Sequence, residues 1–267
     1  MSDSSTHGMR PYALITGASS GIGYELARQF AANGFDVLMV AEDAAIDAAA
    51  AAIGVDGAAE ALRADLREPE EVERVWARVR ATGRPLSAAA INAGVGSGGA
   101  FVTSPLSRDL DVVRLNVTST VHLAKLLLAD MVARNEGRVL FTSSVAATMP
   151  APYNATYAAS KAFVQSFAEA VRREVADAGV TVTALMPGPT DTEFFERAGL
   201  EGSKIDEGHK DDAADVARDG FEALMAGKDH VVAGSARNRM QAGLGKVLPE
   251  KITAVVHGVQ SKPPGTE

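Results

Sequence analysis

The segment from 12 to 23 reads Tyr12-Ala13-Leu14-Ile15-Thr16-Gly17-Ala18-Ser19-Ser20-Gly21-Ile22-Gly23. A short apolar run stops at Thr16-Gly17, and from Ile22 apolar residues recur at helical spacing until Asn33-Gly34 ends the pattern. This order predicts a buried strand, a tight turn and a helix. Glycines let such a turn approach a pyrophosphate, whose charge then lies on the N–H groups of the following helix. The segment indicates an α/β sheet with a dinucleotide site; the alternative is a glycine turn that only allows close packing of helix and sheet.

The glycine spacing narrows the kind of nucleotide site. It is Gly-x-x-x-Gly-x-Gly, and no Gly-Lys-Ser/Thr follows as in a Walker A loop. Glu42 follows the second apolar run, where an acidic side chain can accept hydrogen bonds from both ribose hydroxyls of NAD and would repel a 2′-phosphate. Since no Lys or Arg lies inside the turn, NAD(H) is slightly favoured over NADP(H). The alternative is that Glu42 only begins a helix, with a favourable contact to its dipole.

Strand and helix patterns alternate along the chain. Apolar runs that predict strands lie at 12–15, 37–41, 59–64, 88–91, 138–142, 180–186 and 230–232. Helical patterns lie at 22–33, 43–53, 69–80 and 109–134, around Tyr157, and at 212–226. Strands that are apolar on both faces and separated by helices are typical of a buried parallel sheet with right-handed crossovers. We therefore predict a single-domain α/β fold, a Rossmann-type doubly wound parallel sheet of about seven strands with helices on both faces.

No linker or internal repeat divides the 267 residues. The predicted parts are a flexible N-terminus over 1–10, a Rossmann domain over 11–234 that binds the dinucleotide and carries any catalysis, a C-terminal helical extension over 235–260 and a disordered tail over 261–267. The segment 198–212 is polar and contains glycines. It is too poor in apolar residues to be core, and we expect a mobile surface segment or lid there.

Composition and charge argue against several functional classes. A net charge of −8 without a basic run argues against nucleic-acid and membrane partners. The absence of cysteine excludes disulfides and thiol catalysis and is compatible with a reducing compartment. The five histidines are scattered without ligand spacing, so no metal site is expected. The polar N-terminus does not read as a signal peptide, and we expect a cytoplasmic protein.

Tyr157 and Lys161 stand four residues apart in a helical pattern. Positions with this spacing share one helix face, so the phenol and the ammonium would meet over a single spot. A nearby positive charge favours the phenolate and would lower the pKa of Tyr157 toward the range of a neutral-pH acid and base. On its own the spacing is weak, because an amphipathic surface helix with a packed Tyr and a solvated Lys has the same pattern.

Several motifs in order resemble the short-chain dehydrogenases/reductases, and the resemblance extends to about Gly234. The matching positions are Thr16 to Gly23, Asp65-Leu66, Asn92-Ala93-Gly94, Asn116, Ser144, Tyr157 with Lys161, and Pro187-Gly188 followed by Thr190 and Thr192. The resemblance implies an oxidoreductase that transfers hydride between a nicotinamide cofactor and a carbonyl or secondary alcohol. The implied cofactor-binding residues are Gly17, Ser19, Ser20, Gly21, Ile22, Glu42, Asp65, Leu66, Asn92, Ala93, Gly94, Tyr157, Lys161, Pro187, Gly188, Thr190 and Thr192.

The resemblance also implies roles for four catalytic residues. Tyr157 would exchange a proton with the substrate oxygen, and Ser144 would hydrogen-bond that oxygen. Lys161 would lower the pKa of Tyr157 and hold the nicotinamide ribose, and Asn116 would bind a water that links Lys161 to solvent. Taken alone, Ser144 could merely end a strand and Asn116 could satisfy buried backbone.

Substrate and assembly follow from the resemblance only in outline. The implied pocket positions are mostly apolar and favour an apolar ketone or secondary alcohol; they are Val95 to Gly99, Ala146, Met149, Asn154, Phe194 and Phe195. The helix of Tyr157 has an outer face with Phe163, Phe167 and Val171, so a homodimer or homotetramer is expected. The alternatives are a non-catalytic dinucleotide-binding redox sensor and a sugar-nucleotide epimerase or dehydratase, for which the chain lacks extra length.

Overall fold

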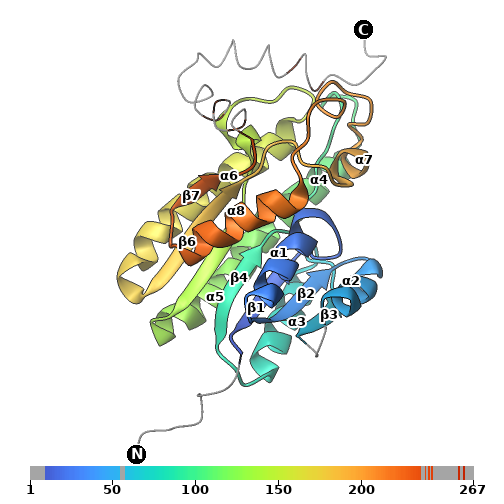
Figure 1. The fold of residues 1–267 in the computed structure, drawn as a ribbon. Coiled ribbons are helices and arrows are strands. Elements are labelled where there is room, and N and C mark those ends of the chain that lie inside the picture. Colours follow the sequence, from blue (N-terminus) through green and yellow to red (C-terminus); the bar gives the residue numbers. More distant parts are fainter. Residues whose placement is uncertain are drawn as a thin grey trace, which may run out of the picture.

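The structure, a computed structural model, describes residues 10–54 and 58–235 together with Asn238, Met240, Ala242, Gly258 and Ser261. The predicted N-terminus over 1–10, the helical extension over 235–260 and the tail over 261–267 lie outside the described residues, apart from Arg10, Ser235 and those single positions. The described chain folds as one sheet with helices packed on both of its faces (Figure 1).

The seven-stranded sheet is parallel throughout, in the order β3-β2-β1-β4-β5-β6-β7. Its strands are β1 (Tyr12–Thr16), β2 (Asp36–Ala41), β3 (Ala59–Arg63), β4 (Leu86–Ile91), β5 (Gly137–Thr142), β6 (Val180–Met186) and β7 (His230–Val232). The strand order reverses direction between β1 and β4, which is where doubly wound sheets open a crevice at the carboxyl ends of their strands. The predicted doubly wound fold is confirmed.

Two apolar layers hold the helices to the sheet. One layer packs α3 (Pro69–Ala81), α5 (Thr120–Arg134) and α6 (Ala155–Val175) against one face. The other packs α1 (Gly21–Ala32), α2 (Ala45–Ile53) and α8 (Ala213–Met225) against the opposite face, and α1 and α8 lie side by side in Figure 1. Because every inner strand is covered on both faces, its side chains are apolar at successive positions rather than alternating.

The helical run from Leu106 to Arg134 departs from the predicted helix over 109–134. It starts earlier, with α4 (Leu106–Val112) following Pro105, and passes through a π-helical stretch, Val113–Ser119, before α5 begins. The run is long and apolar enough to cross a membrane by length and composition. Its inner face, with Leu123, Leu127 and Met131, is fully buried in the layer under the sheet. This is the packing of a core helix.

The segment after β6 contains packing that the sequence patterns missed. A short helix, α7 (Phe194–Ala198), forms there, and Leu200 is 1% exposed. Leu200 and Ile205 pack with Phe195 and Phe194 in a small apolar cluster separate from the two main layers. The expectation that 198–212 is too poor in apolar residues to be core is therefore wrong at Leu200 and Ile205. These two aliphatic side chains are enough to form a small core together with the two phenylalanines that precede them.

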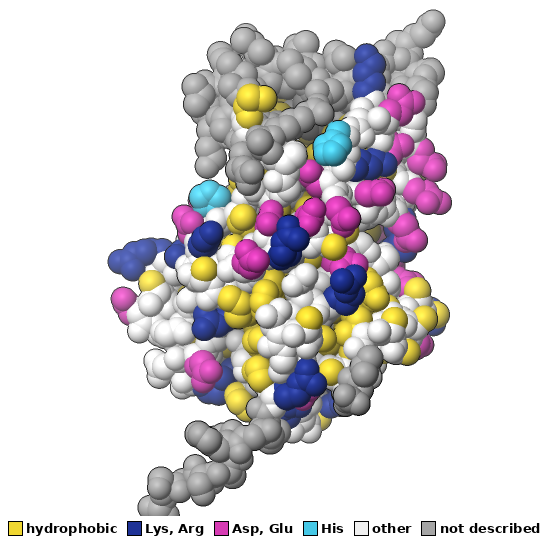
Figure 2. All heavy atoms as spheres, in the orientation of Figure 1, with side chains coloured by type: hydrophobic (Ala, Val, Ile, Leu, Met, Phe, Trp, Pro, Cys, Tyr) yellow, Lys and Arg dark blue, Asp and Glu magenta, His cyan; other side chains and the backbone are white. Residues whose placement is uncertain are grey.

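Charged side chains cover the outer surface with mixed signs. On the face shown in Figure 2, Lys and Arg are scattered among Asp and Glu and do not gather into a basic patch. Described ion pairs join neighbouring residues of one helix, such as Arg74 with Glu71 and Arg134 with Asp130. Such exposed pairs contribute little to stability individually.

Phe30 allows a direct test of the α1–α8 layer. Its ring is fully buried and packs edge-on against Phe35 at 5.1 Å and Phe221 at 5.0 Å. We expect Phe30→Ala to lower the free energy of unfolding by about 3–5 kcal/mol, through lost burial and the cavity left behind. The matched control is Phe101→Ala, because Phe101 is 63% exposed; it should cost less than about 0.5 kcal/mol. Denaturant unfolding measures the loss of unfolding free energy in both variants. Equal losses would contradict the buried position of Phe30 between α1 and α8.

Candidate active site

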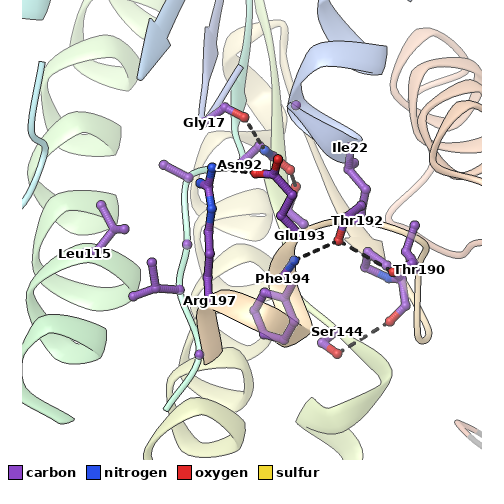
Figure 3. Close-up of a pocket in the computed structure, with 18 of the residues that line it drawn as sticks. Gly17, Ile22, Asn92, Leu115, Ser144, Thr190, Thr192, Glu193, Phe194 and Arg197 are labelled. Atoms are coloured by element: carbon purple, nitrogen blue, oxygen red, sulfur yellow. Dashed lines mark hydrogen bonds and ion pairs between the residues drawn. The ribbon is translucent and has the colours of Figure 1, made fainter. Parts of the chain in front are cut away.

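One cleft opens where β1 and β4 separate at the carboxyl end of the sheet. Its walls combine residues from separate parts of the chain, from the first turn to the segment after β6 (Figure 3). The predicted residues that line it are Gly17, Ser19, Ser20, Gly21, Ile22, Glu42, Asp65, Leu66, Asn92, Ala93, Gly94, Val95, Gly96, Ser144, Ala146, Asn154, Tyr157, Lys161, Pro187, Gly188, Thr190, Thr192, Phe194 and Phe195. Asn116 lies behind this wall, and Ser97, Gly98, Gly99 and Met149 are not among the described residues that line the cleft.

The first turn needs glycine for reasons that the structure shows directly. Gly17 has a φ of +64°, and a Cβ there would lie 2.9 Å from the Cα of Ala93. A Cβ at Gly23 would lie 1.9 Å from the carbonyl oxygen of Gly17, so no side chain fits. The turn is thus held in close contact with the Asn92–Gly94 segment after β4. Its backbone N–H groups at the start of α1 form the kind of cradle that binds an anion.

Ser144, Tyr157 and Lys161 meet beneath the cleft. Ser144 follows β5 and accepts a hydrogen bond from the N–H of Ala146 at 3.1 Å. Tyr157 and Lys161 both belong to α6, and the Lys161 Nζ lies 5.8 Å from the centre of the Tyr157 ring. The Lys161 ammonium donates to the carbonyl oxygen of Thr142 at 2.8 Å. The helix therefore supplies the phenol and the ammonium, and the end of β5 orients them.

The electrostatics of this pair differ from the sequence-based expectation. Burial raises the pKa of Tyr157 to about 12, although its hydrogen bond with Ser144 acts in the opposite direction. Burial lowers the pKa of Lys161 to about 8. The expectation that Lys161 lowers the pKa of Tyr157 is not met in the cofactor-free protein, because loss of hydration dominates both groups. Tyr157 is a protonated phenol here, and Lys161 is a buried cation at neutral pH.

Asn116 lies in the π-helical stretch and is 1% exposed. Its carboxamide bonds the backbone of Val95 twice, accepting from the N–H and donating to the carbonyl, each at 2.9 Å, and it also donates to Ser160 Oγ at 2.9 Å. Gly94 separates it from the ammonium: a Cβ at Gly94 would lie 3.1 Å from Lys161 Nζ and 3.2 Å from Asn116 Oδ1. Asn116 thereby fixes the loop after β4, and its oxygen faces the same glycine as Lys161.

Glu42 does not stand alone at the end of β2. Arg67 donates a hydrogen bond to the Glu42 carboxylate and also bonds Asp65, with Nε 2.9 Å from Oδ1. The bond from Arg67, more than any other influence, lowers the pKa of Asp65. Ser19 of the turn donates to Asp43 at 2.8 Å. Both carboxylates were predicted from the sequence, but Arg67 was not. Its contact with Glu42 joins residues 25 positions apart, and such a separation gives no local signal in the sequence.

The segment from Thr192 to Leu200 forms the outer wall of the cleft. The ring of Phe194 packs against the Tyr157 ring, with centres 5.1 Å apart. The N–H of Gly98 donates to the carbonyl of Ala198 at 2.7 Å, and a Cβ at Gly98 would lie 2.6 Å from Leu200 Cδ2. Arg197 extends along the cleft and pairs with Glu193 at 2.5 Å (Figure 3). Glu193, Arg197, Leu200 and Ile205 also line the cleft and were not predicted. The helix α7 is too short to show a helical period, and Leu200 and Ile205 follow it in a segment without a periodic apolar pattern.

Comparison with known proteins identifies the family of the chain. The sequence pattern of the family described as short chain dehydrogenase matches residues 11–201. The 3-oxoacyl-[acyl-carrier-protein] reductase FabG of Escherichia coli is 30% identical over 195 residues, which cover 70% of this chain and 79% of that protein.

Solved structures extend the likeness over most of the fold. A short-chain dehydrogenase from Sphingobium yanoikuyae in complex with NADPH has a TM-score of 0.78 and 29% identity, covering 90% of this chain and 96% of that one. The 3-ketoacyl-(acyl-carrier-protein) reductase from Brucella melitensis, complexed with NADH, has a TM-score of 0.77 and 26% identity, covering 85% and 98%. With the family pattern over 11–201 and this fold, the protein belongs to the short-chain dehydrogenases/reductases, oxidoreductases that use a nicotinamide cofactor.

Proposed function

We propose that the protein transfers hydride between a nicotinamide cofactor and a carbonyl or secondary alcohol, with Tyr157 as the general acid and base. The observation that carries the proposal is the convergence of Tyr157, Ser144 and Lys161 at the floor of the cleft that the glycine turn borders. A protonated phenol bonded to a serine, with a buried ammonium close by, is suited to giving a proton to a substrate oxygen.

The backbone of the glycine turn suits the binding of a dinucleotide in the cleft. At Gly17, Gly21 and Gly23 a Cβ would lie within 3 Å of neighbouring atoms, so the chain is kept bare of side chains where a pyrophosphate would approach. Glu42 would hold the adenosine ribose, and Asp65 with Leu66 would border the adenine. The nicotinamide half would lie along two groups of residues: Asn92, Ala93 and Gly94, and then Pro187, Gly188, Thr190 and Thr192. When bound, the nicotinamide supplies or accepts the hydride.

The protein's own residues handle the proton. Tyr157 donates its hydroxyl proton to the carbonyl oxygen during reduction and takes one from the alcohol during oxidation. Ser144 hydrogen-bonds the same substrate oxygen and stabilises the charge that develops on it. Lys161 would hold the ribose hydroxyls of the cofactor and keep a positive charge beside Tyr157, and Asn116 would bind a water on the route from Lys161 to solvent. Phe194 covers the reacting end of the cleft and excludes water.

NAD(H) is the favoured cofactor in this proposal, by a small margin. Glu42 would accept hydrogen bonds from the ribose hydroxyls and repel a 2′-phosphate. Arg67, paired with the same carboxylate, offsets part of that repulsion. The related structures complexed with NADPH and with NADH show that both cofactors occur on this fold.

The substrate, assembly and location are proposed only in outline. The walls near Tyr157 are apolar, with Val95, Ala146, Phe194 and Phe195, and suit an apolar ketone or secondary alcohol. We propose a homodimer or homotetramer because Leu110, Val113, Val121 and Phe163 are exposed on the helices α4 to α6. A cytoplasmic location is compatible with a chain without cysteine.

Tyr157→Phe tests the proton-transfer role. The phenylalanine keeps the ring that packs on Phe194 but removes the acidic hydroxyl. We expect kcat/KM for ketone reduction to fall by at least about 100-fold, the usual contribution of a positioned acid, while the Kd for NADH changes by less than about threefold, or about 0.7 kcal/mol. Steady-state kinetics and fluorescence titration measure the two. Retained turnover would contradict the role, and cofactor binding without turnover in the wild type would favour the redox-sensor alternative.

Parallel titration with NADH and NADPH tests the cofactor preference. We expect the wild type to bind NADH more tightly. Glu42→Gln should shift the ratio of Kd values toward NADPH by about tenfold, or about 1.4 kcal/mol, because it removes the repelling charge and leaves Arg67 to meet a phosphate. Glu68→Gln serves as the control, since Glu68 lies outside the cleft-lining residues and should leave the ratio unchanged. A tenfold preference of the wild type for NADPH would show that Glu42 does not select NAD.

Lys161→Met tests whether the buried ammonium is kept for function. The pKa of Lys161 is about 8 in the folded protein and 10.5 in the unfolded chain, because burial disfavours the charged form. Below pH 8 the folded protein therefore bears the full free-energy cost of burying the charge, and this cost disappears as the pH rises to 10.5. A difference of this size corresponds to about 3 kcal/mol. Relative to the variant, the cofactor-free wild type should therefore gain up to about 3 kcal/mol of stability between pH 7 and pH 10.5.

Urea unfolding at several pH values measures this difference. Lys125→Met is the matched control, because Lys125 is an exposed helical lysine and no such pH dependence should appear. A stability difference between wild type and Lys161→Met that does not change with pH would show that the ammonium is not penalised by burial.

A further inference from the structure

Asp211 is a buried residue in the chain between α7 and α8. It is 8% exposed, and its backbone forms a parallel bridge with Thr190. The N–H of Asp211 donates to the carbonyl of Pro189 at 2.9 Å, and its own carbonyl accepts from the N–H of Asp191 at 2.9 Å. These two hydrogen bonds lie on either side of Thr190. The position of Thr190 therefore depends on the position of Asp211.

The side chain of Asp211 binds the chain that follows β7. Its Oδ1 accepts a hydrogen bond from the N–H of Ser235 at 3.0 Å, and its Oδ2 accepts one from Asn238 Nδ2 at 2.6 Å. Asn238 is 2% exposed, and its Nδ2 also donates to the carbonyl of Ala233 at 2.9 Å. Gly234 lets the carboxylate approach, because a Cβ there would lie 2.5 Å from Asp211 Oδ2. A carboxylate suits both contacts, since each of its oxygens accepts and neither donates.

Asn238 also contacts the cleft wall at Gly188. A Cβ at Gly188 would lie 2.2 Å from Asn238 Oδ1 and 2.3 Å from its Nδ2, so the carboxamide packs on bare backbone. Gly188 and Thr190 both line the cleft, and the Thr190 hydroxyl donates to the carbonyl of Gly188 at 3.0 Å. Asp211 and Asn238 are not among the described residues that line the cleft. They therefore hold this part of its wall from behind.

We propose that Asp211 and Asn238 are positioning residues for the nicotinamide half of the cofactor. They hold Gly188 and Thr190 where that half would lie, and neither of them touches the cofactor itself. The inference rests on the proposed function, which places the nicotinamide along these two cleft residues. Asn238 belongs to the predicted extension over 235–260. The chain after β7 is therefore part of the cofactor site and not an appendage to it.

Binding of NADH and of ADP-ribose to the full-length protein separates this role from a general effect on the cleft. ADP-ribose contains the adenosine, the pyrophosphate and the second ribose but lacks the nicotinamide. We expect Asn238→Ala to raise the Kd for NADH by at least about fivefold, the size expected when one or two hydrogen-bonded contacts are lost. The Kd for ADP-ribose should change by less than about twofold, because the glycine turn and Glu42 keep their contacts. Calorimetric titration measures both.

Asp211→Asn tests the carboxylate without changing its shape. The new NH2 group must face either the N–H of Ser235 or the Nδ2 of Asn238, so one buried contact brings two donors together. We expect the same selective loss of NADH affinity, and the double variant with Asn238→Ala should add less than about twofold, because both changes break one contact. Asp212→Asn is the matched control. Asp212 accepts from the N–H of Ala214 as the cap of α8, and asparagine caps a helix equally well, so both Kd values should stay unchanged.

Each other outcome has a definite meaning. Equal rises in the Kd for NADH and for ADP-ribose would overturn the proposal, because they would assign the contact to the whole cleft, and unchanged values for both would overturn it too. If Asp211→Asn does not fold, Asn238→Ala decides alone, and failure of both variants to fold would assign the contact to the fold and overturn the proposal. Wild-type protein that binds NADH but reduces no ketone would contradict the proposed function. The ratio of the two Kd values would still test Asp211 and Asn238, because it needs no turnover.

Discussion

The hydroxyl group of Thr16 holds the two sides of the cleft at a fixed separation. It accepts hydrogen bonds from the backbone N–H groups of Asn92 at 2.9 Å and Ala93 at 3.0 Å. Thr16 ends β1 and Asn92 follows β4, at the point where the two strands stop pairing and their chains turn to opposite faces of the sheet. Without a side-chain acceptor there, two buried N–H groups beyond the last strand pair would stay unsatisfied. Thr16 therefore holds the ends of β1 and β4 together at the point where the crevice opens.

From Thr16 a chain of hydrogen bonds leads to Lys161 at the floor of the cleft. The Asn92 side chain donates to the Thr16 carbonyl at 3.2 Å and accepts from the Thr142 hydroxyl at 3.0 Å. The Thr142 carbonyl accepts from the Lys161 ammonium at 2.8 Å, and Lys161 lies on the same helix as Tyr157. Strand ends therefore orient a helix that would otherwise only pack on the sheet. This explains how a buried cation is tolerated in the site, since its strongest contact is a backbone oxygen held in place by a strand.

The sequence predicted what depends on local chemistry and missed what depends on distant contacts. Alternating apolar runs were sufficient for the parallel sheet, and the glycine spacing marked the turn, because both follow from backbone geometry. The contact of Arg67 with Glu42 and the anchoring of Asn116 to Val95 join residues from different elements, so no spacing in the chain encodes them. The pKa of Tyr157 was misjudged for a related reason. Helical spacing indicates where a charge lies, whereas the raised value comes from burial, which only the assembled walls determine.

The loops over Tyr157 are fixed by a second set of contacts, independent of the Thr16 chain. Buried Asp109 of α4 accepts hydrogen bonds from Ser97, Ser104 and Thr156, at 3.1, 3.1 and 2.6 Å. Burial on its own would raise the pKa of this carboxyl, but the hydrogen bonds from the three hydroxyls outweigh it, and the pKa is lowered. Asp109 therefore stays ionised and acts only as an acceptor. Thr156 precedes Tyr157, and Ser97 and Ser104 bracket the loop on which Ala198 and Leu200 rest.

The two networks therefore hold the same helix from opposite sides. The Thr16 chain fixes Lys161 against the sheet, and Asp109 fixes the start of α6 against the loops that border the cleft. A change in the loops can therefore alter the shape of the cleft without moving Lys161, because different contacts hold the loops and Lys161. This separation is a physical reason why one sheet serves many substrates in folds of this kind.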